Sequence, residues 1–338
     1  MNEIASIESV AEAIYDLRSQ IELVVDKKEI KPILFREWAI LWLDTWRKGI
    51  VSDISFFDTY RRPVIKHLIP FFGDCYLHTI TPLQIQQFFN AKAENYTMES
   101  LRKMKFPLIS IFTTGIENQH CLTNPVTSSI RLHSKIPPAE KGTWTQDEYN
   151  IVAAFAKDHP NGLCIMLLME TAMTRSEMLG LRIMDVDLSD CTITICGGTI
   201  ETRNSTSGSW EIQRTSGKNS YRLRKIPISK DLSAHLSAAM AGQKKTNYVF
   251  KSKTGGPKCP NNWYKREYRK FMKDLKREYP DIKILTPHEL RHTRATLLVQ
   301  QGVDLYTVAH LLGHCDLSML SKRYLHSDVN AMRKAIGL

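Results

Sequence analysis

The amino-acid sequence predicts a mostly α-helical protein with a small antiparallel β-sheet (α+β), organised in two domains. The chain has 338 residues, a length that fits two domains of ordinary size. Apolar residues recur at helical spacing over most of the chain, whereas alternating β-branched segments are confined to about residues 191–229. Residues 131–142, "RLHSKIPPAEKG", combine prolines, a glycine and mixed charges, and this composition predicts a linker between the two domains.

The first domain is expected to be entirely helical. Residues 1–30 form an N-terminal arm to which the sequence assigns no role, and residues 31–130 form the helical domain. Its first helix places aromatic side chains along one face, which favours a packing stripe over a ligand site: Phe35, Trp38, Trp42 and Trp46. Thr81 followed by Pro82 predicts the start of a later helix. Five basic residues of this domain are candidates for contact with a phosphate backbone: Arg61, Arg62, Lys66, Lys103 and Lys105.

The second domain, residues 143–338, opens with a capping box from Thr145 to Glu148 that predicts a helix. The segments "CTITICGG" and "SWEIQRTSGKNSYRLRKIPIS" alternate in polarity and predict the antiparallel sheet. The segment "NNWYKREYRKFMKDLKREYP" predicts a helix with an apolar face that includes Tyr264 and Tyr268. Its basic side chains favour a face directed at phosphates, with three candidates: Lys265, Arg266 and Arg269.

Charge and cysteine content restrict the class of protein. The formal net charge is +11, from 46 Lys and Arg against 35 Asp and Glu, which makes a polyanion such as nucleic acid the leading partner class. The seven cysteines form no C-x-x-C pair, which argues against a zinc site or a disulfide framework and for reduced cytoplasmic thiols. The acidic N-terminus does not fit a signal peptide, and the most apolar stretch, "LCIMLLMETAM", predicts a buried helix rather than a membrane span.

Three groups that can carry positive charge gather in the stretch "LTPHELRHTRATLL". Thr286 is a candidate N-cap and Pro287 the first helical residue, so His288 lies in the first turn, with Arg291 and His292 one turn later. Backbone N–H groups and the helix dipole favour an anion at this end of a helix. A guanidinium fork beside an imidazole is well suited to a phosphate oxygen. The stretch therefore predicts a phosphate-binding site.

The pattern continues beyond this helix in a way that resembles a known family. His288 and Arg291 are followed by "LLGH", which ends at His314, and then by Tyr324 in "SKRYLH". This order closely resembles the tyrosine recombinases, the integrases of phages and mobile elements. The segments "ITPLQIQQFF" and "SKTGGPKCPNNWYKREYRKF" are also similar to family segments, and the resemblance spans about residues 31–338.

The resemblance implies a reaction and a role for each matching residue. Tyr324 is the expected nucleophile, which attacks a DNA phosphodiester and forms a 3′-phosphotyrosyl bond. Arg291 would bind the scissile phosphate, with His288 and His314 donating hydrogen bonds. Lys218 matches the lysine that protonates the leaving 5′ oxygen, although three neighbours are alternatives: Arg222, Arg224 and Lys225. The resemblance implies no metal and no other cofactor.

One family position departs from the pattern. The family's first catalytic arginine lies in a segment that reads roughly T-G-L-R-x-S-E-L-L-G-L-R. Here the segment is "TAMTRSEMLGLR", with Thr174 at the arginine position and Arg175 next to it. Either the helix begins late enough for Arg175 to enter the site as a catalytic residue, or the site lacks one of its two arginines. Both alternatives remain open from the sequence.

The leading hypothesis for function is a site-specific DNA recombinase, an integrase of a mobile element. The resemblance implies a C-shaped clamp around double-stranded DNA, formed by a core-binding (SAM-like) domain and a catalytic domain. It implies a tetramer on two DNA sites, with accessory DNA-bending proteins as further candidate partners and no membrane partner. It also implies a cytoplasmic, nucleoid-associated location in a prokaryotic cell.

Two other functions are weighed against this one. A catalytically weakened, recombinase-fold DNA-binding regulator is suggested by Thr174, and a type IB topoisomerase shares the catalytic set. The size of the chain and the sequence of its first domain favour the recombinase. The tail after Tyr324 is amphipathic, and it docks either on a neighbouring subunit or on its own domain.

Overall fold

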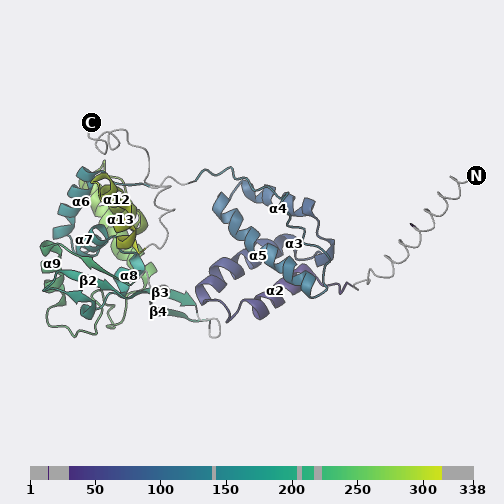
Figure 1. The fold of residues 1–338 in the computed structure, drawn as a ribbon, viewed down its shortest axis with the longest axis horizontal. Coiled ribbons are helices and arrows are strands. Elements are labelled where there is room, and N and C mark those ends of the chain that lie inside the picture. Colours follow the sequence, from purple (N-terminus) through teal and green to yellow (C-terminus); the bar gives the residue numbers. More distant parts are fainter. Residues whose placement is uncertain (1–13, 15–29, 139–141, 204–207, 217–222, 314–338) are drawn as a thin grey trace, which may run out of the picture. The chain divides into compact units, whose positions relative to one another are not determined.

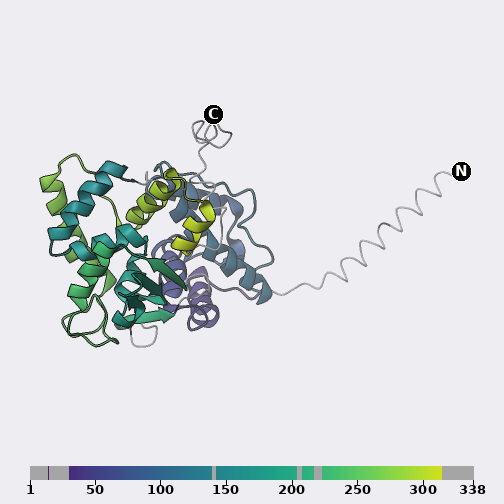
Figure 2. The ribbon, with the colours of Figure 1, turned by 60° about the vertical axis from the view of Figure 1, so that its left-hand side comes forward.

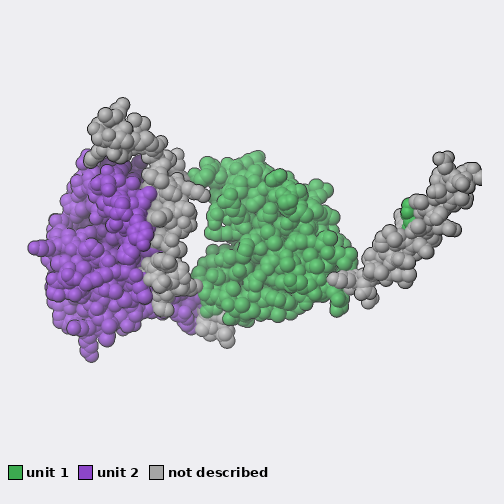
Figure 3. Space-filling model, in the orientation of Figure 1, with its two compact units in different colours: residues 1–139 green, residues 140–338 purple. Residues whose placement is uncertain are grey.

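A computed structural model describes residue 14 and residues 30–138, 142–203, 208–216 and 223–313. The chain divides into two compact units, residues 1–139 and residues 140–338, which are coloured separately in Figure 3. Each unit has its own cluster of buried apolar side chains. Helices dominate both units and the strands are few, so the predicted fold class is confirmed (Figure 1). Within the described ranges, no helix has both the length and the apolar character needed to cross a membrane.

The first unit is built from helices packed around aromatic side chains. Trp38 and Trp42 are buried on α2, which confirms the predicted packing stripe, and the Trp38 indole donates a hydrogen bond of 2.9 Å to the Ile111 carbonyl. Thr81 caps α4 and Pro82 is its first residue, as predicted. The described elements are α2 (Phe35–Trp46), η1 (Ser55–Arg61), η2 (Val64–Leu68), α3 (Ile69–Phe72), η3 (Leu77–Thr79), α4 (Pro82–Ala93) and α5 (Met98–Glu117).

The second unit packs its helices around α7, which is almost wholly buried, as the apolar stretch predicted. In Figures 1 and 2, α12 and α13 lie side by side. The described helices are α6 (Gln146–Asp158), α7 (Gly162–Thr171), α8 (Arg175–Gly180), η4 (Ile183–Asp185), α9 (Lys230–Met240), α10 (Pro260–Trp263), η6 (Tyr264–Tyr268), α11 (Arg269–Glu278), α12 (Pro287–Gln300) and α13 (Leu305–Leu312).

The strands form two small antiparallel sheets rather than the single sheet that the sequence predicted. The strands are β1 (Val186–Asp187), β2 (Thr192–Ile195), β3 (Gly197–Arg203), β4 (Trp210–Ser216) and β5 (Arg224–Pro227). One sheet has the order β1-β2-β5, with Ile193 opposite Ile226, and the other is the β3-β4 hairpin. The segment "CTITICGG" is divided between them because β2 ends at Ile195 and β3 begins at Gly197.

The β3-β4 hairpin packs directly against α8. A Cβ atom on Gly198 would lie 2.9 Å from the backbone carbon of Ser176, so only a glycine allows this approach. A Cβ atom on Gly180 would likewise lie 2.8 Å from the Cα of Gly198. This close contact between backbones fixes the position of α8. This helix begins directly after Thr174, the residue that stands at the family's arginine position.

Candidate active site

The first turn of α12 is built as the sequence predicted. The Thr286 N–H donates to Glu289 Oε2 at 2.7 Å and the Glu289 N–H donates to Thr286 Oγ1 at 3.4 Å, a capping box that starts the helix. Pro287 is its first residue. His288 is exposed in the first turn, and its ring packs edge-on against His292 with centroids 4.4 Å apart. The helix therefore presents an imidazole at its positive end.

Arg291 is held by backbone carbonyls from two other parts of the unit. Its side chain is 7% exposed. Nη1 donates to the Ala172 carbonyl at 2.9 Å, and Nη2 donates to the Leu312 carbonyl. Ala172 follows α7 and Leu312 ends α13, so three helices determine the direction of this guanidinium. A charged donor fixed in this way loses little freedom when it binds an anion.

Glu177 lies between two arginines. Arg224 has no exposed side-chain surface and donates to both Glu177 carboxylate oxygens, at 2.9 and 3.1 Å, while Arg291 Nη1 lies 3.9 Å from the same carboxylate. Burial raises the pKa of Glu177, but the hydrogen bonds and charge of Arg224, with help from Thr174 and Arg291, lower it overall. Glu177 is therefore an anion that holds both guanidinium groups in place.

The same network fixes the end of α13. Arg224 Nε donates to the Leu311 carbonyl at 2.8 Å, next to the Leu312 carbonyl that accepts from Arg291. Gly313 then ends the helix in the left-handed region, with φ of 65°. His314 follows directly in the sequence.

Thr174 acts as the cap of α8. Thr174 Oγ1 accepts from the Glu177 N–H at 3.2 Å, and the Thr174 N–H donates to Glu177 Oε2 at 2.8 Å. The helix begins at Arg175, after a turn in which Ala172 has a positive φ of 52°. The residue that departs from the family pattern thus has a structural role that its hydroxyl explains.

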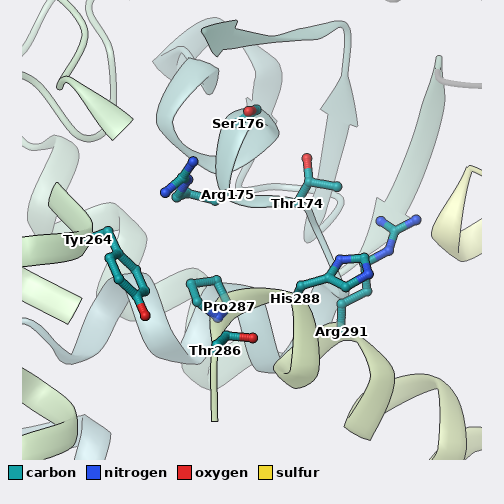
Figure 4. Close-up of a pocket in the computed structure, with 8 residues that line it drawn as sticks. All are labelled: Thr174, Arg175, Ser176, Tyr264, Thr286, Pro287, His288 and Arg291. Atoms are coloured by element: carbon teal, nitrogen blue, oxygen red, sulfur yellow. The ribbon is translucent and has the colours of Figure 1, made fainter. Parts of the chain in front are cut away.

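Two adjoining cavities surround these residues, each with a volume of about 350 Å³. Four residues line both cavities: Thr174, Ser176, His288 and Arg291. Gly313 lines only one of them, which is called here the Gly313 cavity. Arg175, Tyr264 and Thr286 line only the other, the Tyr264 cavity, which is shown in Figure 4. The predicted cations therefore converge on a hollow that is large enough for a phosphate.

The structure brings together three of the six predicted catalytic residues: His288, Arg291 and Arg175. The other three lie outside the described residues: Lys218, His314 and Tyr324. Two alternatives to Lys218 are described. Arg224 is committed to Glu177, and exposed Lys225 pairs with Asp190 at 2.6 Å.

Four of the five candidate DNA-binding residues in the first unit are exposed: Arg61, Arg62, Lys66 and Lys103. Arg62 and Lys103 form surface ion pairs with Asp58 and Glu99, at 3.0 and 3.6 Å. Such exposed pairs are weak and do not prevent contact with phosphates. Lys105 differs, because it is half-buried and donates to the Ile130 carbonyl at 3.2 Å.

In the second unit, the candidates Lys265, Arg266 and Arg269 are exposed on η6 and α11. Lys265 and Arg269 line a third hollow of about 960 Å³. Four further basic residues line it: Lys270, Lys273, Lys276 and Arg277. The predicted basic face is therefore a surface with a broad concavity, and Asp274 is the one acidic residue among the described residues that line it.

Sequence reasoning missed two features of the site. The Glu177–Arg224 pair joins residues 47 positions apart, and the sequence marked both residues without linking them. Tyr264 was assigned to an apolar face with Tyr268, and its half-exposed position at the cavity was not foreseen. One signal in the sequence could have indicated the Glu177–Arg224 pair. The alternating pattern around Arg224 places this arginine on the inward face of a strand, where a charged residue needs a buried partner.

Comparison with known proteins agrees with this geometry. The described part of the chain is mostly helical and has two units, and a buried arginine and an exposed histidine line one cavity of the second unit. Residues 143–331 match the model of the phage integrase family, and residues 34–93 match that of the phage integrase N-terminal SAM-like domain. The chain therefore belongs to the phage integrase family.

Its relatives are recombinases and transposases. The tyrosine recombinase XerA of Pyrococcus horikoshii is 26% identical over 250 residues, which cover 72% of this chain and 75% of the relative. The transposase from transposon Tn916 of Enterococcus faecalis is 22% identical over 283 residues, which cover 75% of this chain and 65% of the relative. The tyrosine recombinase XerC of Staphylococcus haemolyticus is 31% identical over 183 residues, 53% of this chain and 54% of the relative.

Solved structures share the fold. The Tn1549 transposon integrase in complex with a circular intermediate DNA superimposes with a TM-score of 0.73, covering 90% of this chain and 99% of that chain at 18% identity. A lambda integrase dimer bound to a COC' core site gives a TM-score of 0.62, covering 94% of this chain and 85% of that chain at 18% identity.

Proposed function

We propose that this chain is a site-specific recombinase of a mobile element, an integrase that cleaves and rejoins double-stranded DNA through a 3′-phosphotyrosyl intermediate. The observation that carries the proposal is Arg291, which is buried, held by two carbonyls and placed beside exposed His288 at a cavity large enough for a phosphate. Family membership supplies the reaction class, and the basic chain supplies the attraction to DNA.

The proposed reaction assigns one role to each residue. The Tyr324 hydroxyl gives up its proton to water and forms a bond to the scissile phosphorus, while the bond from phosphorus to the 5′ oxygen of the next nucleotide breaks and that oxygen takes a proton from Lys218. Arg291 and His288 stabilise the charge that develops on the non-bridging oxygens, with His314 as a further donor. A 5′ hydroxyl of another strand then returns its proton to Lys218 and attacks the phosphorus of the phosphotyrosyl ester. This restores a phosphodiester, breaks the bond to the Tyr324 oxygen and releases the side chain, which takes a proton from water.

Thr174 limits the charge that this site provides. Where the family pattern has its first catalytic arginine, this chain has the helix cap Thr174, so the scissile phosphate is bound by fewer cations. The runner-up function, a DNA-binding regulator, gains no support from the relatives, whose names describe recombinases and transposases.

The proposed assembly is a clamp with two arms. Residues 31–130 would form the core-binding arm, residues 131–142 the linker and residues 143–338 the catalytic arm, with residues 1–30 as an additional N-terminal segment. A lambda integrase of the same fold has been seen as a tetramer bound to a Holliday junction, which supports a tetramer on two DNA sites. The proposed setting is the nucleoid in a prokaryotic cytoplasm, with DNA-bending proteins as accessory partners.

The deciding experiment is covalent trapping. The protein is incubated with a nicked suicide duplex built from the joined ends of its own element, in which the cleaved fragment diffuses away and prevents religation. The expected result is a protein–DNA adduct attached at Tyr324, which Tyr324→Phe abolishes without loss of DNA binding. Specific binding with no adduct, even after prolonged incubation, would reject the recombinase in favour of the regulator.

A further inference from the structure

Arg175 occupies a different side of the site from the residues expected to hold the scissile phosphate. It lines the Tyr264 cavity and not the Gly313 cavity, although His288 and Arg291 line both. Figure 4 shows Thr174 between the two guanidinium groups, with Arg175 on the Tyr264 side and Arg291 on the other. Thr174 has the extended backbone of an N-cap and Arg175 is the first helical residue, and their side chains point in different directions (Figure 4).

The chemistry of the Tyr264 cavity suits an anion. None of the described residues that line it is acidic, and the Arg175 guanidinium has no hydrogen bond or ion pair with any described residue. Arg175 is half-buried, so its charge is partly desolvated, and no carboxylate in the described part of the chain pairs with it. A bound anion would compensate this cost.

Tyr264 is held in place beside Arg175. Its ring stacks on Tyr268, with centroids 5.5 Å apart and an interplanar angle of 15°. The buried Tyr268 hydroxyl in turn donates to the Leu285 carbonyl at 2.7 Å, just before the cap of α12. The Tyr264 side chain therefore lines the cavity on a fixed support, with its hydroxyl directed toward Thr286 and Pro287 as a potential donor to a bound anion (Figure 4).

We propose that Arg175 and Tyr264 bind the DNA backbone phosphate that neighbours the one bound by Arg291 and His288. The inference rests on the proposed function, because it names a second DNA contact of the same site. The two cavities share four lining residues, as two consecutive phosphates of one strand would require. Arg175 is then a positioning residue, which sets the register of the strand, and it does not replace the arginine that is absent at Thr174.

The test locates the phosphate that each side chain contacts. Binding is measured in the Tyr324→Phe background, on duplexes from the element's ends that each carry one neutral methylphosphonate linkage at a successive position. Arg175→Ala is expected to lower the slope of log affinity against log salt by about one. It should also make one position insensitive to the neutral linkage, and Tyr264→Phe should weaken the sensitivity at that same position.

Two further variants mark the neighbouring phosphate. Arg291→Gln is expected to remove sensitivity at the adjacent linkage, and His288→Gln, at an exposed site, marks that linkage if the buried substitution prevents folding. Lys157→Ala is the matched control, because it removes one positive charge from α6, where Lys157 pairs with Asp231 at 2.8 Å. This control should leave every position sensitive.

Two results would overturn the inference. Arg175→Ala and the His288 or Arg291 variant could abolish the sensitivity of binding to the neutral linkage at the same position. Arg175 would then bind the scissile phosphate together with Arg291 and His288. Alternatively, Arg175→Ala could leave all positions as sensitive as before, which would mean that Arg175 contacts no phosphate. Because Tyr324→Phe cannot cleave, these results do not depend on whether trapping yields an adduct, and failure of the proposed function is recognised separately.

Discussion

Thr174 shows how one residue can preserve a local structure while changing the chemistry of a site. Its hydroxyl and N–H complete the capping box with Glu177, so α8 starts in register although the family's arginine is absent. The sequence could predict the departure, because the neighbouring landmarks align. It could not predict where Arg175 points, since that depends on the exact residue at which the helix begins.

Restoring the arginine tests this interpretation. We expect Thr174→Arg to accelerate adduct formation on the suicide duplex by on the order of 10²–10³-fold, because it adds a charged donor between the two cavities. Loss of the cap should lower the free energy of unfolding by about 1 kcal/mol, measured by urea denaturation. Thr174→Ser keeps the cap without the charge, and it should change neither quantity. An unchanged cleavage rate in Thr174→Arg would mean that the site is complete without this arginine.

At the scale of elements, the sequence located the helix starts and most strands, but it did not predict how the strands divide into sheets. The predicted starts of α4, α6 and α12 are confirmed, because each depends on three or four adjacent residues. The division of the strands into two sheets depends on the close approach of β3 to α8, a contact between distant segments. The Glu177–Arg224 pair, which links α8 to β5, escaped prediction for the same reason.

The pH dependence of the free energy of unfolding should reveal the contribution of the Glu177–Arg224 ion pair. The pKa of Glu177 is lowered from its ordinary value of 4.5, so its contribution to stability is complete above pH 4.5 and is lost as the pH falls through the lowered pKa. We expect Glu177→Gln to lower the free energy of unfolding at pH 7 by about 3 kcal/mol, because Arg224 keeps a buried charge without its counter-ion. The difference from the unsubstituted protein, followed by denaturant unfolding, should shrink below pH 4.5. A difference that stays constant down to pH 3 would contradict an ionised Glu177 in the folded state.

At the scale of the whole molecule, the two separate hydrophobic cores mean that each unit can keep its fold when the chain between them is cut. We expect a protease site inserted between Ala139 and Glu140, at the boundary of the two units, to allow cleavage without loss of helical circular dichroism. Affinity for a duplex from the element's ends should then fall by about 10²–10⁴-fold, because the second arm no longer benefits from a high effective concentration. The uncut protein with the same insertion is the control. Unchanged affinity after cleavage would show that one unit accounts for all the binding.

The left-handed turn at Ala172 links the orientation of the Arg291 guanidinium to the packing of a small apolar cluster in the interior. Alanine in this conformation costs about 1 kcal/mol relative to glycine, yet the Ala172 side chain is fully buried among Ala295, Val308 and Leu312. The carbonyl group bonded to the Ala172 Cα accepts a hydrogen bond from Arg291. A change of volume in this small cluster would rotate that carbonyl and redirect the guanidinium. Substitutions in the interior thus have a route to altered strand cleavage without any contact with DNA.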